Sequence, residues 1–376
     1  MGKRTRANGE GSVYQRKQDG QWCAVIMLAD GKRRTYVRRT RKEAGGKLIE
    51  VLKKSREGLP LADERMTVGR YLAEWLPTIK QSVRPKTYAR YDSYVNRHIV
   101  PMLGRVRLTQ LTPQHVQRLY ADRHSSGLSP TTVHHIHACL HKALKQAVRW
   151  SLVGRNVTDL VDVPRIARHE MATFTAEQAR AFVAAVTGDR LEAVYVLALT
   201  TGMRQGELLA LKWRDVDLDS GTVKVRGTLQ QTPGGLVVAE PKTSGSRRQV
   251  SITAVAIAAL RRHRTRQSEE RLRLGSAWED TGFLFTTPKG GPIDADNLRN
   301  RSFYPLLKNA GLPRLRFHDL RHTAASLMFS ENIHPKIVSD MLGHSRVSTT
   351  LDLYSHAVPN IQQKATEALD RLLAEG

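Results

Sequence analysis

The chain has 376 residues, enough for two or three domains, and its 40% hydrophobic and 25% charged content is ordinary for a folded protein. Its 60 Lys and Arg against 35 Asp and Glu give a net charge of +25, which indicates a polyanionic partner, most often nucleic acid. No apolar run reaches the roughly 18 residues of a membrane span, the basic N-terminus lacks the apolar stretch of a signal peptide, and two cysteines are too few for a disulfide framework.

The first 58 residues predict a small, basic β-sheet module followed by a helix over 41–55. They carry much of the charge, since sixteen Lys or Arg face six Asp or Glu in the first sixty residues. β-Ribbons of this size enter DNA grooves, so Arg33, Arg34 and Arg38 are candidate DNA contacts. The alternative is a solvated basic extension, which two regular Asp-Gly turn signals disfavour. The expected strands are 11–17, 21–28 and 32–39.

The next segment, 65–155, predicts a block of four helices. Each helix has a start signal, either an N-cap hydroxyl or a proline suited to a first turn. The expected helices are 67–80, 85–99, 112–126 and 129–150. Lys86, Arg90 and Arg97, with the neighbouring His98, are candidate phosphate contacts. For any one of them, an exposed position on a solvated helix face, without a DNA contact, is the simpler interpretation.

Histidines crowd the fourth of these helices. His134, His137 and His141 share one face, an arrangement that can bind a metal ion. A polar or DNA-facing stripe is the favoured alternative, and we expect no metal site here.

After a polar linker over 153–171, the remaining residues, 172–376, predict a mostly helical domain with a small antiparallel sheet. Helices are expected at 175–186, 191–200 and 203–213 and from about residue 253 onward, and strands at 222–228, 235–240 and 247–252. The whole chain is therefore expected to be mainly α and multidomain.

Two basic residues stand on one face of the helix predicted for HDLRHTAASLM. His318 and Arg321 are three positions apart, whereas His322 should point elsewhere. A zinc site on His318 and His322 is disfavoured, because the glutamate of an HExxH motif and further ligands are missing.

Further candidates lie in distinct local contexts, two of them well upstream of this helix and two after it. Arg204 follows a Thr-Gly turn in TGMRQGELLALKW, where Glu207 could orient it through a salt bridge. Lys242 lies in AEPKTSGSRRQ, His344 in LGHS and Tyr354 in TTLDLYSH.

These residues follow the order Arg…Lys…His-x-x-Arg…His…Tyr, which resembles the tyrosine recombinases, the phage-integrase family. The resemblance is strongest over about 173–373, and none of its six active positions departs from the pattern. It implies an arm-type DNA-binding module over 1–58, a helical core-binding domain over 65–155 and a catalytic domain over 172–376.

The resemblance also implies a chemistry. Cleaving a phosphodiester without a metal or cofactor requires a nucleophile, cations for the charge on phosphate oxygens and an acid for the leaving 5′-oxygen. Tyr354 would attack phosphorus and leave a 3′-phosphotyrosine, and Arg204 and Arg321 would clamp the phosphate. Lys242, on a tight connection between strands, would be the acid, and His344 would hydrogen-bond the phosphate.

The function implied is integration and excision of the DNA of a phage or other mobile element. The expected partners are double-stranded attachment sites, three further copies of the chain in a DNA-bound tetramer, and an accessory DNA-bending or directionality factor. We expect cytoplasmic localisation in a bacterial host. The N-terminal module favours an integrase over a two-domain resolvase. A type IB topoisomerase and a non-catalytic architectural protein are the alternatives: DNA relaxation by a monomer without strand exchange would indicate the first, and the complete set of active positions disfavours the second.

Overall fold

The computed structural model describes residues 11–27, 33–56, 65–166, 171–232, 234–240, 247–343 and 350–351, together with Thr366, Asp370, Leu373 and Ala374. Internal contacts divide the chain into two units, residues 1–168 and 169–376. The boundary falls inside the polar linker expected over 153–171. No described helix combines the length and apolarity that crossing a membrane requires.

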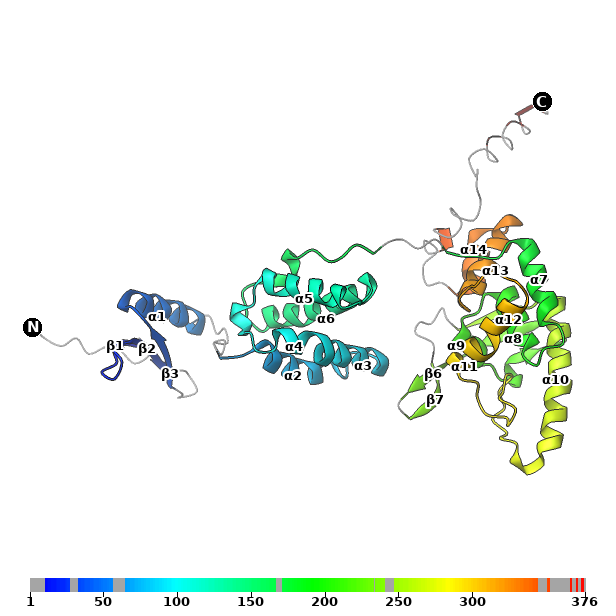
Figure 1. The fold of residues 1–376 in the computed structure, drawn as a ribbon, viewed down its shortest axis with the longest axis horizontal. Helices are drawn as coiled ribbons and strands as arrows, with labels where there is room; N and C mark the ends of the chain where they lie inside the picture. Colours follow the sequence, from blue (N-terminus) through cyan, green and yellow to red (C-terminus); the bar gives the residue numbers. More distant parts are fainter. Residues whose placement is uncertain are drawn as a thin grey trace, which may run out of the picture. The chain divides into compact units, whose positions relative to one another are not determined.

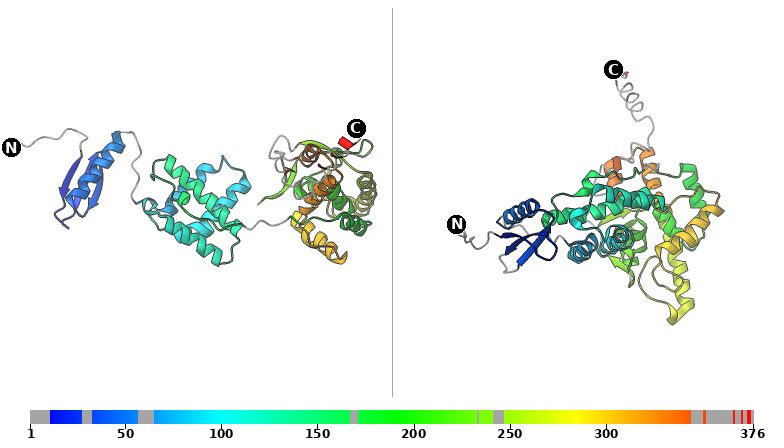
Figure 2. Two further views of the ribbon diagram at one scale, coloured as in Figure 1. Left: turned by 90° about the horizontal axis from the view of Figure 1, so that it is seen from above. Right: turned by 60° about the vertical axis from the view of Figure 1, so that its left-hand side comes forward.

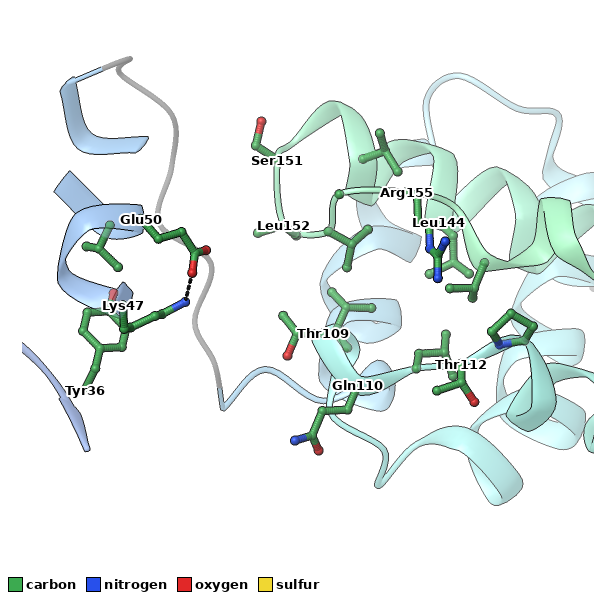
Figure 3. A pocket seen from close by; sticks show the side chains of 18 residues that line it. Tyr36, Lys47, Glu50, Thr109, Gln110, Thr112, Leu144, Ser151, Leu152 and Arg155 are labelled. Atoms are coloured by element: carbon green, nitrogen blue, oxygen red, sulfur yellow. Dashed lines mark hydrogen bonds and ion pairs between the residues drawn. The ribbon is translucent and has the colours of Figure 1, made fainter. Parts of the chain in front are cut away.

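The N-terminal module is a three-stranded antiparallel sheet in the order β1-β2-β3, with a helix across one face (Figures 1 and 2). Its core joins Ala24, Ile26 and Tyr36 of the sheet to Ala44 and Val51 of the helix. Lys47 of the helix pairs with Glu50 at 3.0 Å, and Figure 3 shows this pair near Tyr36. The elements are β1 (Ser12–Gln15), β2 (Trp22–Met27), β3 (Arg33–Arg38) and α1 (Arg41–Arg56).

Four helical segments form the next block, and their starts follow the sequence signals. The Thr67 hydroxyl accepts from Arg70 N at 3.2 Å, Ser129 caps in the same way, and Thr112 forms a capping box with His115. The segment expected over 85–99 is α3 followed without a break by a π-helical turn. The elements are α2 (Val68–Ile79), α3 (Pro85–Tyr94), η1 (Val95–Ile99), α4 (Val100–Leu103), η2 (Leu108–Gln110), α5 (Pro113–Ser125), α6 (Pro130–Arg149) and η3 (Val157–Leu160).

The second unit is organised around α8, a helix buried on nearly every side. Such a helix must be covered all round, and α7, α10 and α13 pack against it. Figure 1 shows α10 at the edge of this unit away from α13 and α14. The helices are α7 (Ala176–Val186), α8 (Glu192–Thr201), α9 (Gln205–Leu209), η4 (Trp213–Asp215), α10 (Ala254–Leu274), η6 (Gly275–Ala277), α11 (Ala295–Asn297), η7 (Leu298–Phe303), α12 (Tyr304–Asn309), α13 (Asp319–Ser330) and α14 (Pro335–Leu342).

The β structure of this unit is antiparallel, as expected, but it forms two sheets rather than one. The single strand expected over 222–228 is broken at Gly227, where a side chain would come within 2.8 Å of Val238. One sheet has the order β4-β5-β8, and β6 pairs with β7 in a separate hairpin. The strands are β4 (Val216–Asp217), β5 (Thr222–Val225), β6 (Thr228–Thr232), β7 (Gly235–Ala239) and β8 (Arg248–Ser251).

Candidate active site

Arg204 stands where α8 ends and α9 begins. Gly202 ends α8 in the left-handed conformation, with φ of +62°, and Arg204 becomes the N-cap of α9. Glu207 accepts from Arg204 twice, from the backbone N at 3.1 Å and from Nη1 at 2.8 Å. The predicted salt bridge is therefore confirmed. The Arg204 side chain is 39% exposed, so Glu207 fixes a guanidinium that remains open to a ligand.

Arg321 lies on the first turn of α13 and is 3% exposed. Its Nη1 donates to the carbonyls of Gly202, at 2.8 Å, and Leu342, at 2.7 Å. Its Nη2 is buried and has no hydrogen-bond partner within the described part of the chain. Burial and the nearby Arg204 lower the pKa of Arg321 to about 9. A buried guanidinium with a vacant donor and a second cation beside it is a site for an anion.

His318 is the N-cap residue of α13, and its ring lies 5.1 Å from the ring of His322, edge to face. The expectation that His322 points elsewhere is wrong, because residues four apart lie on the same helix face. Partial burial, His322, Arg321 and Arg204 lower the pKa of His318 to about 4. The imidazole is therefore neutral at neutral pH and offers one donor and one acceptor.

A third arginine, Arg248 on β8, belongs to this cluster and was not among the predicted residues. Its side chain is 7% exposed and its Nη2 lies 3.0 Å from Glu207 Oε2. Burial acts to raise the pKa of the Glu207 carboxyl, but Arg248 and Arg204 outweigh it and hold that pKa below its usual value. One feature of the sequence could have indicated that Arg248 is buried. In a strand over 247–252, Arg248 alternates in phase with the buried Val250 and Ile252.

The other three predicted catalytic residues, Lys242, His344 and Tyr354, lie outside the described residues. For Lys242, only the strands on either side of it can be compared with the expectation. Lys242 was placed on a tight connection between neighbouring strands, but the flanking β7 and β8 belong to different sheets. The chain is described up to Gly343, which ends α14 with φ of +68° immediately before His344.

The candidate DNA contacts of the first unit are exposed to different degrees. Lys86, Arg90 and Arg97 are exposed and recur at spacings of four and seven along α3 and η1, so they share one face. Arg33 is exposed, whereas Arg34 and Arg38 on the same strand are partly buried.

The histidines of α6 each contact a different partner. His134 Nε2 lies 3.0 Å from Pro164 O, His137 Nδ1 lies 2.9 Å from the Tyr120 hydroxyl, and His141 Nε2 lies 2.9 Å from Asp159. Among the residues that the structure places, no three potential ligands surround a common point. His134 and His141 thus attach the segment after α6 to the helix, and His137 joins α6 to Tyr120 of α5.

Two protein-family profiles and a known relative match the sequence of this chain. The profile of the Phage integrase family matches residues 172–360, and that of the phage integrase N-terminal SAM-like domain matches residues 67–123. The chain is 31% identical to the tyrosine recombinase XerC-like protein of Caldanaerobacter subterraneus subsp. tengcongensis, over 99% of this chain and 100% of that protein.

Two solved structures share the fold. The Tn1549 transposon integrase in complex with a circular intermediate DNA gives a TM-score of 0.70 at 22% identity, covering 81% of this chain and 99% of that one. A lambda integrase tetramer bound to a Holliday junction gives a TM-score of 0.57 at 19% identity, covering 92% and 96% of the two chains.

Proposed function

The chain belongs to the phage integrase family and is a tyrosine recombinase that cleaves and rejoins DNA; from this premise we propose that Tyr354 is its nucleophile. The observation that carries the proposal is the pairing of Arg204 and Arg321 across the end of α14. One guanidinium is open to solvent, and the other has a buried donor with no partner among the described residues. Two cations so placed match the paired oxygens of a phosphodiester.

The proposed reaction is a transesterification in two steps. The Tyr354 oxygen bonds to phosphorus while the bond from phosphorus to the 5′-oxygen breaks, giving a 3′-phosphotyrosine and a 5′-hydroxyl. Lys242 protonates the departing 5′-oxygen, and the tyrosine's own proton passes to a nearby base. Arg204 and Arg321 offset the charge on the non-bridging oxygens, with hydrogen bonds from His318 and His344. A 5′-hydroxyl from a second strand then reverses the step.

We assign the chain three domains: an arm-type DNA-binding module over 1–58, a core-binding domain over 65–155 and a catalytic domain over 172–376. The profile matches over 67–123 and 172–360 support the second and third. The substrate is a pair of double-stranded attachment sites, held by four copies of the chain with an accessory DNA-bending or directionality factor. Free, buried Cys23 and Cys139 suit a reducing bacterial cytoplasm.

A nicked suicide substrate tests the nucleophile. Duplexes carrying the element's own attachment site, nicked so that the cleaved fragment diffuses away, are incubated with enzyme in the absence of divalent metal. Wild type should give a protein–DNA adduct that survives denaturation, and Tyr354→Phe should give none because it lacks the attacking oxygen. Tyr304→Phe, which removes the hydroxyl of a partly buried tyrosine on α12, is the control and should retain the adduct.

Each contrary result has a distinct meaning. An adduct that persists in Tyr354→Phe would show that a different residue attacks. Tight binding of the duplex by wild type, with no adduct, would favour a non-catalytic architectural role.

A further inference from the structure

Three arginines from three elements hold the C-terminal turn of α14. The last carbonyls of a helix have no partner within it and carry partial negative charge, so cations there stabilise the helix end. Here three consecutive carbonyls each receive one guanidinium. The pairs are Arg248 Nε to Met341 O at 2.7 Å, Arg321 Nη1 to Leu342 O at 2.7 Å and Arg204 Nη2 to Gly343 O at 3.3 Å.

Arg248 differs from both of the other arginines: it is much less exposed than Arg204, and unlike Arg321 it has no buried nitrogen that lacks a partner among the described residues. Its side chain is 7% exposed, whereas that of Arg204 is 39% exposed. Its guanidinium donates both to Glu207 and to Met341 O. Glu207 also accepts a hydrogen bond from Arg204, which is one of the proposed phosphate-binding arginines. Arg248 therefore links Glu207 to the end of α14.

At Gly343, the end of α14 lies close to the Arg248 guanidinium. The Gly343 φ of +68° is the left-handed conformation that favours glycine, and a Cβ there would lie 2.8 Å from Arg248 Nη1. The backbone that leaves α14 therefore passes directly over the Arg248 guanidinium. The next residue along the chain is His344, and Tyr354 lies ten residues further on.

Bound DNA should affect the bonds of Arg204 and Arg248 differently. A phosphate oxygen is a stronger acceptor than a peptide carbonyl, so it will compete for Arg204 Nη2, whose bond to Gly343 O is the longest of the three. Arg248 Nε and Nη2 are already bonded to Met341 O and Glu207, at 2.7 and 3.0 Å, and both bonds are shorter than that of Arg204 to Gly343 O. When Arg204 turns to the phosphate, Arg248 still holds the helix end.

We propose that Arg248 is a positioning residue for strand cleavage, fixing Glu207, and through it Arg204, to the helix end from which the chain continues to His344 and Tyr354. The inference rests on the proposed function of those residues. Arg248 itself touches neither the DNA nor the reacting atoms.

The test compares Arg248→Gln with Arg190→Gln. Arg190 is a matched control, because it also joins a carboxylate, Glu270, to a backbone carbonyl, Thr286 O, but lies between α7 and α8 and contacts no part of α14. Adduct formation on the suicide substrate is measured at saturating duplex, together with duplex affinity, thermal unfolding and hydrogen exchange over residues 335–350.

For Arg248→Gln we expect adduct formation to slow by about 10- to 100-fold, as is usual when the group orienting a catalytic residue is lost, with duplex affinity changed by less than about threefold. Hydrogen-exchange protection over 335–350 should fall. Arg190→Gln should keep the wild-type rate and protection even where its thermal stability falls as far. Arg248→Lys should recover part of the rate, because lysine keeps the positive charge beside Glu207. The recovery should be incomplete, because lysine lacks the planar guanidinium that also reaches Met341 O.

Wild-type cleavage by Arg248→Gln would overturn the inference, and so would equal slowing in Arg190→Gln, which would indicate only a loss of stability. If wild type itself forms no adduct, the proposed function fails separately. Hydrogen exchange still tests whether Arg248 holds the end of α14. Unchanged protection over 335–350 in Arg248→Gln would overturn that part of the inference.

Discussion

At the scale of single residues, the active-site cluster depends on two glycines as much as on its arginines. Gly202 and Gly343 both adopt left-handed conformations, and both present bare backbone to an arginine or to the helix end that it holds. Gly202 O accepts from Arg321, and Gly343 O accepts from Arg204. A side chain at Gly202 would displace Leu342, whose carbonyl accepts from Arg321, and a side chain at Gly343 would displace the Arg248 guanidinium.

Gly202→Ala should therefore lower the free energy of unfolding by more than its backbone strain alone would. Its Cβ would overlap Leu342 Cδ2, whereas the Cβ of Gly311→Ala, at a nearly identical φ of +64°, would meet nothing within 4 Å. We expect Gly311→Ala to lower the free energy of unfolding by about 1–2 kcal/mol, the usual cost of a left-handed non-glycine residue. Gly202→Ala should lower it by about 2–4 kcal/mol, because overpacking adds to that strain.

Urea titration of both variants measures these free energies of unfolding, and the suicide substrate measures their cleavage. Only Gly202→Ala should cleave more slowly than wild type. Equal destabilisation of the two variants would mean that Leu342 moves aside without cost and that the close packing is unimportant.

At the scale of elements, local signals predicted most of the helices. Thr67, Thr112 and Ser129 cap their helices because a cap depends only on residues within one turn. Contacts between distant segments were harder to predict. The division of the sheet depends on Gly227 approaching Val238, and the role of Arg248 depends on a helix end almost one hundred positions away. The motifs around Arg204 and Arg321 and their order along the chain identified these residues, but only the fold shows that both donate to carbonyls at the end of α14.

The N-terminal sheet gives a prediction about which arginine reads DNA. In β3, Tyr36 packs beneath α1, and alternation places Arg34 and Arg38 on that same side. Arg33 falls on the opposite, helix-free face. Arg33→Gln should weaken binding to an accessory-site duplex by about tenfold, on the order of 1 kcal/mol, while Arg34→Gln has a smaller effect.

Fluorescence anisotropy with separate accessory-site and core-site duplexes measures both affinities, and the core-site affinity serves as the internal control. A larger loss for Arg34→Gln than for Arg33→Gln would mean that the helix-covered side of the sheet, not the open face, meets the DNA.

At the scale of the whole molecule, the net charge of +25 admits two accounts of DNA affinity. Either the overall charge attracts the duplex, or a defined set of cations contacts phosphates. The two accounts differ in salt dependence, because each phosphate contact releases counterions and adds about 0.9 to the slope of log K against log salt. Charge removed from a contact face should change that slope, and the same charge removed elsewhere should not.

Two double variants with the same net charge separate these accounts. Lys86→Gln with Arg90→Gln removes two exposed cations from the shared face of α3, whereas Arg261→Gln with Arg273→Gln removes two from α10, on the side of α8 away from α13 (Figure 1). We expect the first pair to reduce the salt slope for a core-site duplex by about two and the second to leave it unchanged. Equal slopes in the two variants would mean that overall charge, and not the face of α3, sets the affinity. The reverse order would place the duplex against α10 and remove Lys86 and Arg90 from the DNA interface.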